Sequence, residues 1–391
     1  MQEHPNESLR RPRTAARPGV MLRLLRGFKE RATNRYAAEP IALSDLDRAR
    51  IEAMVATVNE GKEITQPSLY WRKLIRLNID QLNHTGYGNF KRTLALNYFT
   101  FVNILPWDPQ IRVLARGIPT SRLLKIAVRA LTAKSSQFYS SVNWIQTRIY
   151  QFLTLAMRER LSHMDLEPRL LDLEEPAEGG AIPVRLRDGP LTSADLCNSI
   201  LEYQVARTAI ESAPRAILEL GGGYGRSAFV WLSLNKCKYI MVDIAPALWV
   251  AERYLSTVFK GRKVFYWRRF IDFADVRSEF EASDLCFVTP DQLELLPAAS
   301  IDLGINISSL HEMTIDKIAY YIDQFDRLIA PGGYFYLKAW KRSVLPVDEV
   351  VINRADYPIP ANWRIAVERT PDFQPAFFET VFQKAEAQTS R

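Results

Sequence analysis

A glycine-rich turn that follows a short apolar run offers the first chemistry in the sequence. The run covers 216–218, and the turn at 219–225 is rich enough in glycine for its backbone to bend tightly and approach a ligand. A dinucleotide-binding turn needs a small residue where Arg226 stands, and the Lys-Ser/Thr pair of a phosphate-binding loop is missing. The pattern therefore predicts a site for S-adenosylmethionine, whose ammonium and sulfonium need carboxylate and carbonyl partners such as Glu219. The glycines expected to contact this cofactor are Gly221, Gly223 and Gly225.

An acidic residue closes the next predicted strand. Asp243 stands 24 residues after Glu219, about where an acid meets ribose hydroxyls in nucleotide-binding α/β folds. The alternative is that Asp243 caps the helix that begins near Pro246, because Asp favours helix starts. A strand before the glycines, a helix after them and an acid at the next strand end together favour the binding-site interpretation over an ordinary turn.

The elements that must position these residues alternate between strand and helix. Helical periodicity begins at Ala247 and again near Thr314, where Pro331-Gly332-Gly333 is expected to end the second helix. Strands are predicted at 239–244, 285–288, 301–307, 334–339, 363–367 and 377–382. This alternation predicts an α/β fold with a mostly parallel sheet covered on both faces, and ligands at the carboxyl ends of its strands.

Several segments of the chain together resemble the sugar O-methyltransferase family, a branch of the class I S-adenosylmethionine-dependent methyltransferases. They are 219–225, Asp243, 287–297, 306–313 and 333–336. The resemblance covers roughly 195–385, and its most specific part is the Ser-Ser-Leu-His-Glu-Met segment at 308–313. It implies a Rossmann-like, mostly parallel seven-stranded sheet and methyl transfer from S-adenosylmethionine to a sugar hydroxyl, in a nucleotide sugar or a surface polysaccharide.

Position in the class I fold suggests further cofactor contacts. Asp291 and Gln292 follow the third strand, where class I methyltransferases contact the adenine. Asn306 falls at the end of the next strand and is expected at the same edge of the sheet. Asp291 has an alternative role as the cap of the turn that it begins.

His311 is the candidate general base. Methyl transfer needs a hydroxyl oxygen held in line with the methyl–sulfur bond and a group that takes its proton. Of four histidines, His4, His84, His163 and His311, only the last stands at the carboxyl end of a predicted sheet strand. The helix expected from Thr314 would direct its positive end toward this loop and disfavour the imidazolium, leaving His311 able to accept a proton.

Glu312 is the second catalytic candidate. Its carboxylate can orient the histidine, accept a bond from a sugar hydroxyl, or help to hold a divalent metal ion, so metal dependence stays open. Alternatively, His311 and Glu312 only satisfy the start of the following helix. Ser308 and Ser309 are candidates for the acceptor pocket, although serine in a turn needs no function.

The first half of the chain reads as a mainly helical domain over 37–190, and the methyltransferase domain is expected over 191–385, with a tail at 386–391. Helices are predicted at 51–58, 69–82, 121–131 and 142–161, and a further one near 193–212. The polar loop 83–89 carries His84 and Tyr87, which suit a sugar, although Asn and Gly also dominate simple helix-ending loops. Trp340 is a further acceptor-stacking candidate, with rim packing as its alternative.

Charge is concentrated at the N-terminus. Nine of the 51 Lys and Arg residues lie in 1–36, against three of the 44 Asp and Glu residues. We interpret 1–36 as a solvated, disordered arm, with weak peripheral contact to an anionic membrane as the alternative. No apolar run is long enough for a membrane span or a secretory signal, and Cys197, Cys237 and Cys286 fit reduced core thiols. A cytoplasmic protein is expected.

Two other functions compete with sugar methylation. The cofactor pocket can persist in a non-catalytic scaffold or binding protein, because folds are reused without their chemistry. A methyltransferase that acts on a non-sugar metabolite has the same cofactor motif. A nucleic-acid acceptor is disfavoured, because the chain beyond the arm has no excess of basic residues to neutralise phosphates.

Overall fold

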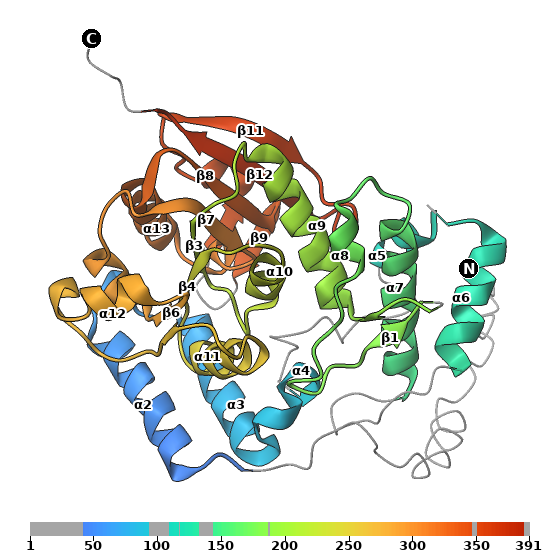
Figure 1. Cartoon of the computed structure of the whole chain (residues 1–391), viewed down its shortest axis with the longest axis horizontal. Coiled ribbons are helices and arrows are strands. Elements are labelled where there is room, and N and C mark those ends of the chain that lie inside the picture. Colours follow the sequence, from blue (N-terminus) through green and yellow to red (C-terminus); the bar gives the residue numbers. More distant parts are fainter. Residues whose placement is uncertain are drawn as a thin grey trace, which may run out of the picture.

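An eight-stranded sheet is the centre of the computed structural model, which describes residues 42–93, 109–116, 118–132, 144–186, 188–345 and 350–386 (Figure 1). The strand order is β11-β12-β8-β7-β3-β4-β6-β5. In chain order the strands are β3 (Ala216–Leu220), β4 (Lys238–Val242), β5 (Val264–Phe265), β6 (Leu285–Val288), β7 (Ile301–Ile307), β8 (Ile329–Trp340), β11 (Trp363–Arg369) and β12 (Phe377–Lys384).

Strand direction and order identify the fold. The strands from β5 to β8 run parallel, and β12 runs antiparallel to both β8 and β11. Successive strands are added on one side of β3 as β4 and β6, and then on the other side as β7 and β8, so the order reverses beside β3. This is the class I, Rossmann-like methyltransferase fold that the sequence predicted, and its ligand site is expected at the reversal point, at the carboxyl ends of the strands.

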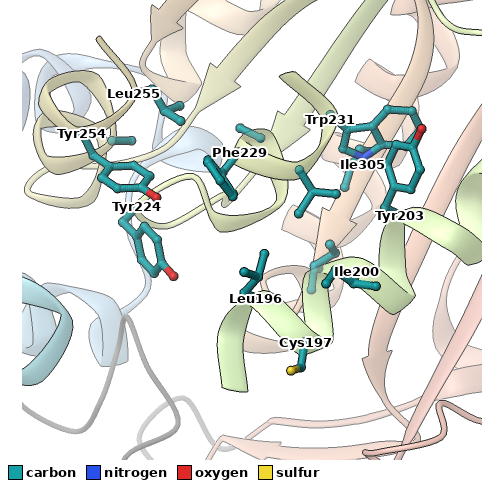
Figure 2. Close-up of a cluster of buried hydrophobic side chains, with 14 of the residues drawn as sticks. Leu196, Cys197, Ile200, Tyr203, Tyr224, Phe229, Trp231, Tyr254, Leu255 and Ile305 are labelled. Atoms are coloured by element: carbon teal, nitrogen blue, oxygen red, sulfur yellow. The ribbon is translucent and has the colours of Figure 1, made fainter. Parts of the chain in front are cut away.

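Helices cover both faces of the sheet, because successive side chains of a strand point to opposite sides. Ile217 of β3 belongs to the core shared with α9 (Ala194–Ala209), α10 (Arg226–Leu234) and α11 (Ala247–Val258). Leu218 and Leu220 belong to the core shared with α12 (Arg277–Ala282) and α13 (Ile315–Leu328). Figure 2 shows part of the first core, in which the Tyr203 ring of α9 lies 4.5 Å from the Trp231 ring of α10.

The N-terminal half is mainly helical, as predicted. Its helices are α2 (Asp45–Glu60), α3 (Leu69–Thr85), α4 (Phe90–Thr93), α5 (Pro109–Arg116), α6 (Thr120–Thr132), α7 (Trp144–Leu161) and α8 (Pro168–Leu171). The 3₁₀ turn η1 (Glu63–Thr65) joins α2 to α3, η2 (Tyr87–Asn89) follows α3, and a short hairpin joins β1 (Val184–Arg185) to β2 (Leu191–Thr192). Ser44, Ser68 and Ser193 accept hydrogen bonds from the first turns of α2, α3 and α9, which explains where these helices begin.

Several details differ from the sequence expectation. Pro331-Gly332-Gly333 lies inside β8 instead of ending a helix, because α13 ends at Leu328 and the strand begins at the next residue. The two-residue edge strand β5 makes the sheet eight-stranded, and a hairpin of β9 (Arg342–Leu345) and β10 (Val350–Asn353) follows β8. The predicted arm 1–36 lies outside the described residues, and so does most of the tail at 386–391.

The three cysteines are free and buried, as expected for core thiols. None of the helices that the structure describes is long and apolar enough to cross a membrane.

Candidate functional site

The glycine turn after β3 adopts a backbone that few other residues tolerate. Gly221, Gly223 and Gly225 have φ values of 74°, 59° and 91°, in the left-handed region that favours glycine. A Cβ atom on Gly221 would lie 2.2 Å from Ser309 Oγ. The turn therefore combines a left-handed backbone with direct packing against the loop that follows β7.

Asp243 fixes the turn to the end of β4. Its Oδ2 accepts a hydrogen bond of 2.8 Å from the Gly223 amide, and its Oδ1 accepts one of 2.7 Å from the Ile244 amide. Neither bond goes to α11, which begins at Ala247, so the capping alternative has no support in these contacts. Burial raises the pKa of Asp243 to about 7, although the two amides act in the opposite direction.

Glu219 lies beneath the turn. The Tyr239 hydroxyl donates to its Oε2 over 2.7 Å, and a Cβ on Gly222 would approach the same oxygen within 2.8 Å. The carboxyl is buried, and burial raises its pKa to about 7. Its contacts make Glu219 a support for the turn, and the expected contact with a cofactor ammonium stays a prediction.

Two predicted cofactor residues use their amides inside the protein. Asn306 donates to the Leu220 carbonyl over 2.9 Å and accepts from the Leu310 amide over 3.1 Å. Gln292 donates to the Arg268 carbonyl over 2.8 Å and accepts from the Thr289 amide over 3.0 Å. Both side chains therefore position loops at the carboxyl edge, and their direct contact with a cofactor stays a prediction.

Asp291 differs from Gln292 in its surroundings. Its Oδ1 is buried and has no hydrogen-bond partner within the part of the chain that the structure describes. A Cβ on Gly61, the residue after α2, would lie 2.9 Å from the Asp291 Cβ, so the end of α2 passes directly over this side chain. Burial raises the pKa of Asp291. The N-cap of the following turn η5 (Pro290–Leu295) is Thr289 rather than Asp291.

The loop after β7 is strained next to the glycine turn. Ser308 has a φ of 59°, which is uncommon for a residue with a side chain and is concentrated at functional sites. Its amide donates to the Lys338 carbonyl of β8 over 2.8 Å. Ser309 follows with its Oγ against Gly221. The short turn η6 (Leu310–Glu312) then presents His311 and Glu312.

His311 is buried in an aromatic pocket. Its ring centroid lies 6.3 Å from that of Trp340 and 6.1 Å from that of Phe377, both nearly perpendicular. Its Nδ1 has no hydrogen-bond partner among the described residues, and its Nε2 lies 3.9 Å from Glu312 Oε1. Burial lowers the pKa of His311 to about 3. The imidazole is therefore neutral, but burial is the cause that the structure shows, rather than the predicted end of α13.

Glu312 lies beside His311 and also near Asp243, the residue after β4. Its side chain is 24% exposed and receives a hydrogen bond from the Trp71 indole. Burial, followed by the nearby Asp243 carboxylate, raises the pKa of Glu312 to about 8, while the Trp71 bond acts in the opposite direction. Glu312 and Asp243 are therefore two carboxyl groups close enough to influence one another's ionisation.

Three aromatic residues that the sequence did not indicate lie close to these carboxyl groups. Trp71 and Tyr70 begin α3, and the pKa of Tyr70 is raised by its burial and then by Glu312. Tyr321 of α13 is buried, and its pKa is raised by burial and then by Asp291 and Asp243. Nothing in the sequence around Tyr70 and Trp71 predicts this position, because it depends on a contact with a residue about 240 positions later in the chain.

Four sets of contacts hold α2 and η1 at the carboxyl edge of the sheet, and Trp71 of α3 adds its bond to Glu312; we call residues 45–85 the strap (Figure 1). Arg50 of α2 binds both oxygens of Glu252 over 2.7 and 2.9 Å, and Arg269 binds Glu60 over 2.6 Å. Lys62 pairs with Glu294. Lys317 donates to three strap carbonyls over 2.7, 2.9 and 2.9 Å, those of Glu63, Ile64 and Gln66.

The three remaining acceptor candidates are placed differently. Trp340 ends β8, is 42% exposed and lies beside His311, so the structure brings these two together. Tyr87 is buried against Trp249 of α11, 5.8 Å between ring centroids. His84 is exposed in the last turn of α3, with its Nδ1 2.6 Å from the Asp80 carbonyl oxygen of its own helix. Gly86 then ends the helix with a φ of 70°, as the loop-ending alternative expects.

No group of three or more His, Cys, Asp or Glu side chains is arranged to hold a metal ion in the described ranges. The donor set beside His311 and Glu312 therefore does not fit a divalent ion.

Comparison with known proteins finds similarity to part of the chain only among solved structures. No family model and no curated protein matches the chain. An SAM-dependent methyltransferase from Aquifex aeolicus is 13% identical, over 47% of this chain and 89% of its own, with a TM-score of 0.33. A 1,6-didemethyltoxoflavin-N1-methyltransferase from Burkholderia thailandensis is 15% identical, over 52% of this chain and 95% of its own, with a TM-score of 0.31. At such scores the assignment of the fold rests on the strand order of the sheet itself.

Proposed function

We propose that this protein is an S-adenosylmethionine-dependent O-methyltransferase that transfers a methyl group to a sugar hydroxyl, in a nucleotide sugar or a surface glycan. The observation that carries this proposal is the gathering of Asp243, Asp291 and Glu312 around a left-handed glycine turn, at the carboxyl edge of a class I methyltransferase sheet. Acidic groups there favour a ligand with hydroxyl groups, an amine and a cation, as S-adenosylmethionine has.

The residues present fit the cofactor at three places. The glycine turn leaves backbone open to the methionine part, and Asp243 stands where ribose hydroxyls are bound in such folds. The unpartnered Oδ1 of Asp291 is an acceptor for the adenine amine. When bound, this cofactor supplies a methyl group made electrophilic by a positively charged sulfur.

Trp340 and the loop after β7 support the acceptor class. The exposed Trp340 ring is an apolar surface of the kind on which the apolar face of a sugar stacks, and Ser308 and Ser309 add hydroxyl groups in the loop that carries its neighbour His311. We assign acceptor contact to these three residues and leave His84 and Tyr87 out, because their contacts lie with α3 and α11. The strap of the helical domain closes the site from the other side.

His311 is proposed as the proton acceptor. With the methyl donor bound, a hydroxyl that took up the methyl group as the methyl–sulfur bond broke would become strongly acidic, so even an imidazole with a lowered pKa would accept its proton. His311 is neutral, and its Nε2 is turned toward Glu312. A hydroxyl held between Trp340 and Glu312 would reach that nitrogen.

A transfer assay tests the acceptor. We expect purified protein to methylate members of a panel of nucleotide sugars and surface glycans, followed as transfer of a labelled methyl group and located by mass spectrometry. Transfer confined to non-sugar metabolites would overturn the sugar assignment and leave methyl transfer intact. Cofactor binding with no transfer to any acceptor would favour the non-catalytic scaffold.

Cofactor binding is testable before any acceptor is known. We expect calorimetry to detect binding of S-adenosylmethionine and S-adenosylhomocysteine, and Gly223→Val to abolish it, because a β-branched residue is strained at a φ of 59° and blocks backbone approach. Gly189→Val, in the β1–β2 hairpin away from the site, is the control. Wild-type protein that fails to bind at millimolar ligand would remove the methyltransferase function.

A further inference from the structure

Asp243 and Glu312 face one another at the site but differ in their hydrogen bonds. Asp243 accepts from two backbone amides, over 2.8 and 2.7 Å. Glu312 receives a single bond, from the Trp71 indole. Because donors to a carboxylate favour its charged form, a negative charge shared by the pair resides on Asp243, and the proton resides on Glu312.

The groups around Glu312 do not supply a balancing positive charge. On its own turn, His311 is neutral and 3.9 Å away. The α3 helix contributes Tyr70 and Trp71, and the end of β4 contributes Asp243. Beyond Asp243, Tyr321 of α13 stands near Asp243 and Asp291. Among the described residues no Lys or Arg forms an ion pair with Glu312.

The missing positive charge is one that a ligand can bring. We infer that the Glu312 carboxyl recognises the sulfonium charge of the methyl donor and thereby favours it over the demethylated product, whose sulfur is neutral. This inference rests on the proposed function. It gives Glu312 a role in selecting the charged cofactor and releasing the spent one, in addition to its place beside the base.

The sign of the pH dependence follows from the protonation of the empty site. Without ligand, Glu312 has its pKa raised to about 8, so it is mostly protonated at neutral pH. A cation beside it favours the carboxylate, so the methyl donor releases a proton on binding and binds more tightly as pH rises toward 8. The neutral product does not release this proton. The α-amino group is common to both ligands, so its effect cancels in their ratio, and the Glu312→Gln variant separates the effect of Glu312 from that of Asp243, which also has a raised pKa.

Calorimetry of both ligands from pH 6 to 8 tests the inference, in buffers of different ionisation enthalpy to count the protons released. We expect the ratio of donor affinity to product affinity to rise by up to about tenfold per pH unit below the pKa of Glu312. An analogue with an ammonium in place of the sulfonium is expected to behave as the donor does.

Variants test whether the proton released when the methyl donor binds comes from Glu312. Glu312→Gln should make the ratio independent of pH and smaller at pH 8, whereas Glu63→Gln, an exposed carboxyl in the strap, should behave as wild type. Trp71→Phe removes the indole N–H from Glu312 and raises the pKa of the carboxyl further, so the ratio at pH 8 should be smaller than in wild type and should still rise with pH. This second variant keeps the test decisive if Glu312→Gln folds poorly.

Three results are informative against the inference. A wild-type ratio that stays constant from pH 6 to 8 would overturn it, and so would a pH-dependent ratio that survives in Glu312→Gln. In both cases the two ligands still bind, so the proposed function stands. If neither ligand binds wild-type protein at any pH, the proposed function itself fails and the inference fails with it.

Discussion

At the scale of single residues, the environment of His311 decides how it can act. Its Nδ1 has no partner in the described structure, and two aromatic rings enclose the imidazole. An imidazolium would be poorly solvated there, so the folded protein keeps the ring neutral. The sequence identified the residue from its place at a strand end, but the aromatic pocket depends on Trp340 and Phe377, which come from other strands.

Replacement of His311 separates catalysis from cofactor binding. We expect His311→Ala to lower the single-turnover rate by roughly 10²- to 10⁴-fold, the usual contribution of a positioned proton acceptor, and to leave S-adenosylhomocysteine affinity nearly unchanged. Rate, affinity and melting temperature are measured on one preparation. His163→Ala, at an exposed histidine in the turn after α7, is the control. Normal turnover in His311→Ala would remove the residue from the mechanism.

Replacement of Asp243 tests the ribose site. Asp243→Ala loses the bonds to the Gly223 and Ile244 amides and the expected ribose contact, so S-adenosylhomocysteine should bind more weakly by about 1 to 3 kcal/mol. Calorimetry measures the change, with Asp275→Ala, an exposed aspartate, as the control. An unchanged affinity would exclude Asp243 from the cofactor site.

At the scale of elements, the sequence predicts long periodic segments well. The bounds of α11, β6, β7 and α13 fall within one or two residues of the ranges that periodicity indicates, because each buries a regular face. The two-residue strand β5 is too short to give an alternating pattern. The extension of β8 back to Ile329 is likewise hidden, because Pro331 and the two glycines after it disfavour a strand locally while pairing with β7 imposes one.

The strap is the element that the sequence placed least well. Its helices were predicted, but periodicity says only that they have a buried face and not which surface they cover. Lys317 shows why, since it joins α13 to carbonyls about 250 residues earlier in the chain. Asp243 and His311 were located in advance because parallel strands place their carboxyl ends at one edge. Trp71 was not located in advance, because its contact with Glu312 depends on how the strap docks on the distant methyltransferase sheet.

Loosening the strap should change ligand exchange more than chemistry. Lys317→Ala removes three hydrogen bonds between α13 and residues 63–66, so we expect faster amide hydrogen exchange in residues 61–75 and faster dissociation of S-adenosylhomocysteine. Mass spectrometry and stopped-flow competition measure the two effects. Lys236→Ala, at an exposed lysine after α10, is the control. An unchanged rate of amide hydrogen exchange in residues 61–75 of Lys317→Ala would show that Lys317 does not hold the strap in place.

At the scale of the whole molecule, buried charge joins the layers of the fold. Glu202 of α9 binds Lys338 of β8 over 2.7 Å and Arg226 of α10 over 3.0 Å. Burial alone would raise the pKa of Glu202, but these two cations lower it to about 2. Among the described residues, Glu219 forms no ion pair, although Arg226 is near enough to oppose the effect of burial, and Asp243 has no cation beside it; burial raises the pKa of each to about 7. The fold therefore holds both ionised pairs and carboxyls that favour protonation.

The stability contributed by Glu202 rises with pH, whereas the stability contributed by Glu219 and Asp243 falls with pH, and the two effects occur in different pH ranges. Glu202 stabilises the fold above its unfolded pKa, and this contribution is lost only in strong acid, as pH falls toward 2. Glu219 and Asp243 bind protons more tightly in the folded state than in the unfolded one. Their contribution is therefore fully present below an unfolded pKa of about 4 and is lost as pH rises through the folded value.

We therefore expect the protein without ligand to become less stable as pH rises from 5.5 to 7.5, by up to about 1.4 kcal/mol per pH unit for each such carboxyl. Melting temperatures at intervals of half a pH unit measure the trend. Glu219→Gln keeps an oxygen for the Tyr239 hydroxyl but cannot ionise, so its curve should be flatter, whereas Glu281→Gln, at an exposed carboxyl, should follow wild type. A melting temperature that is constant or rises over this range, or an equal slope in Glu219→Gln, would contradict the assignment of these buried carboxyls.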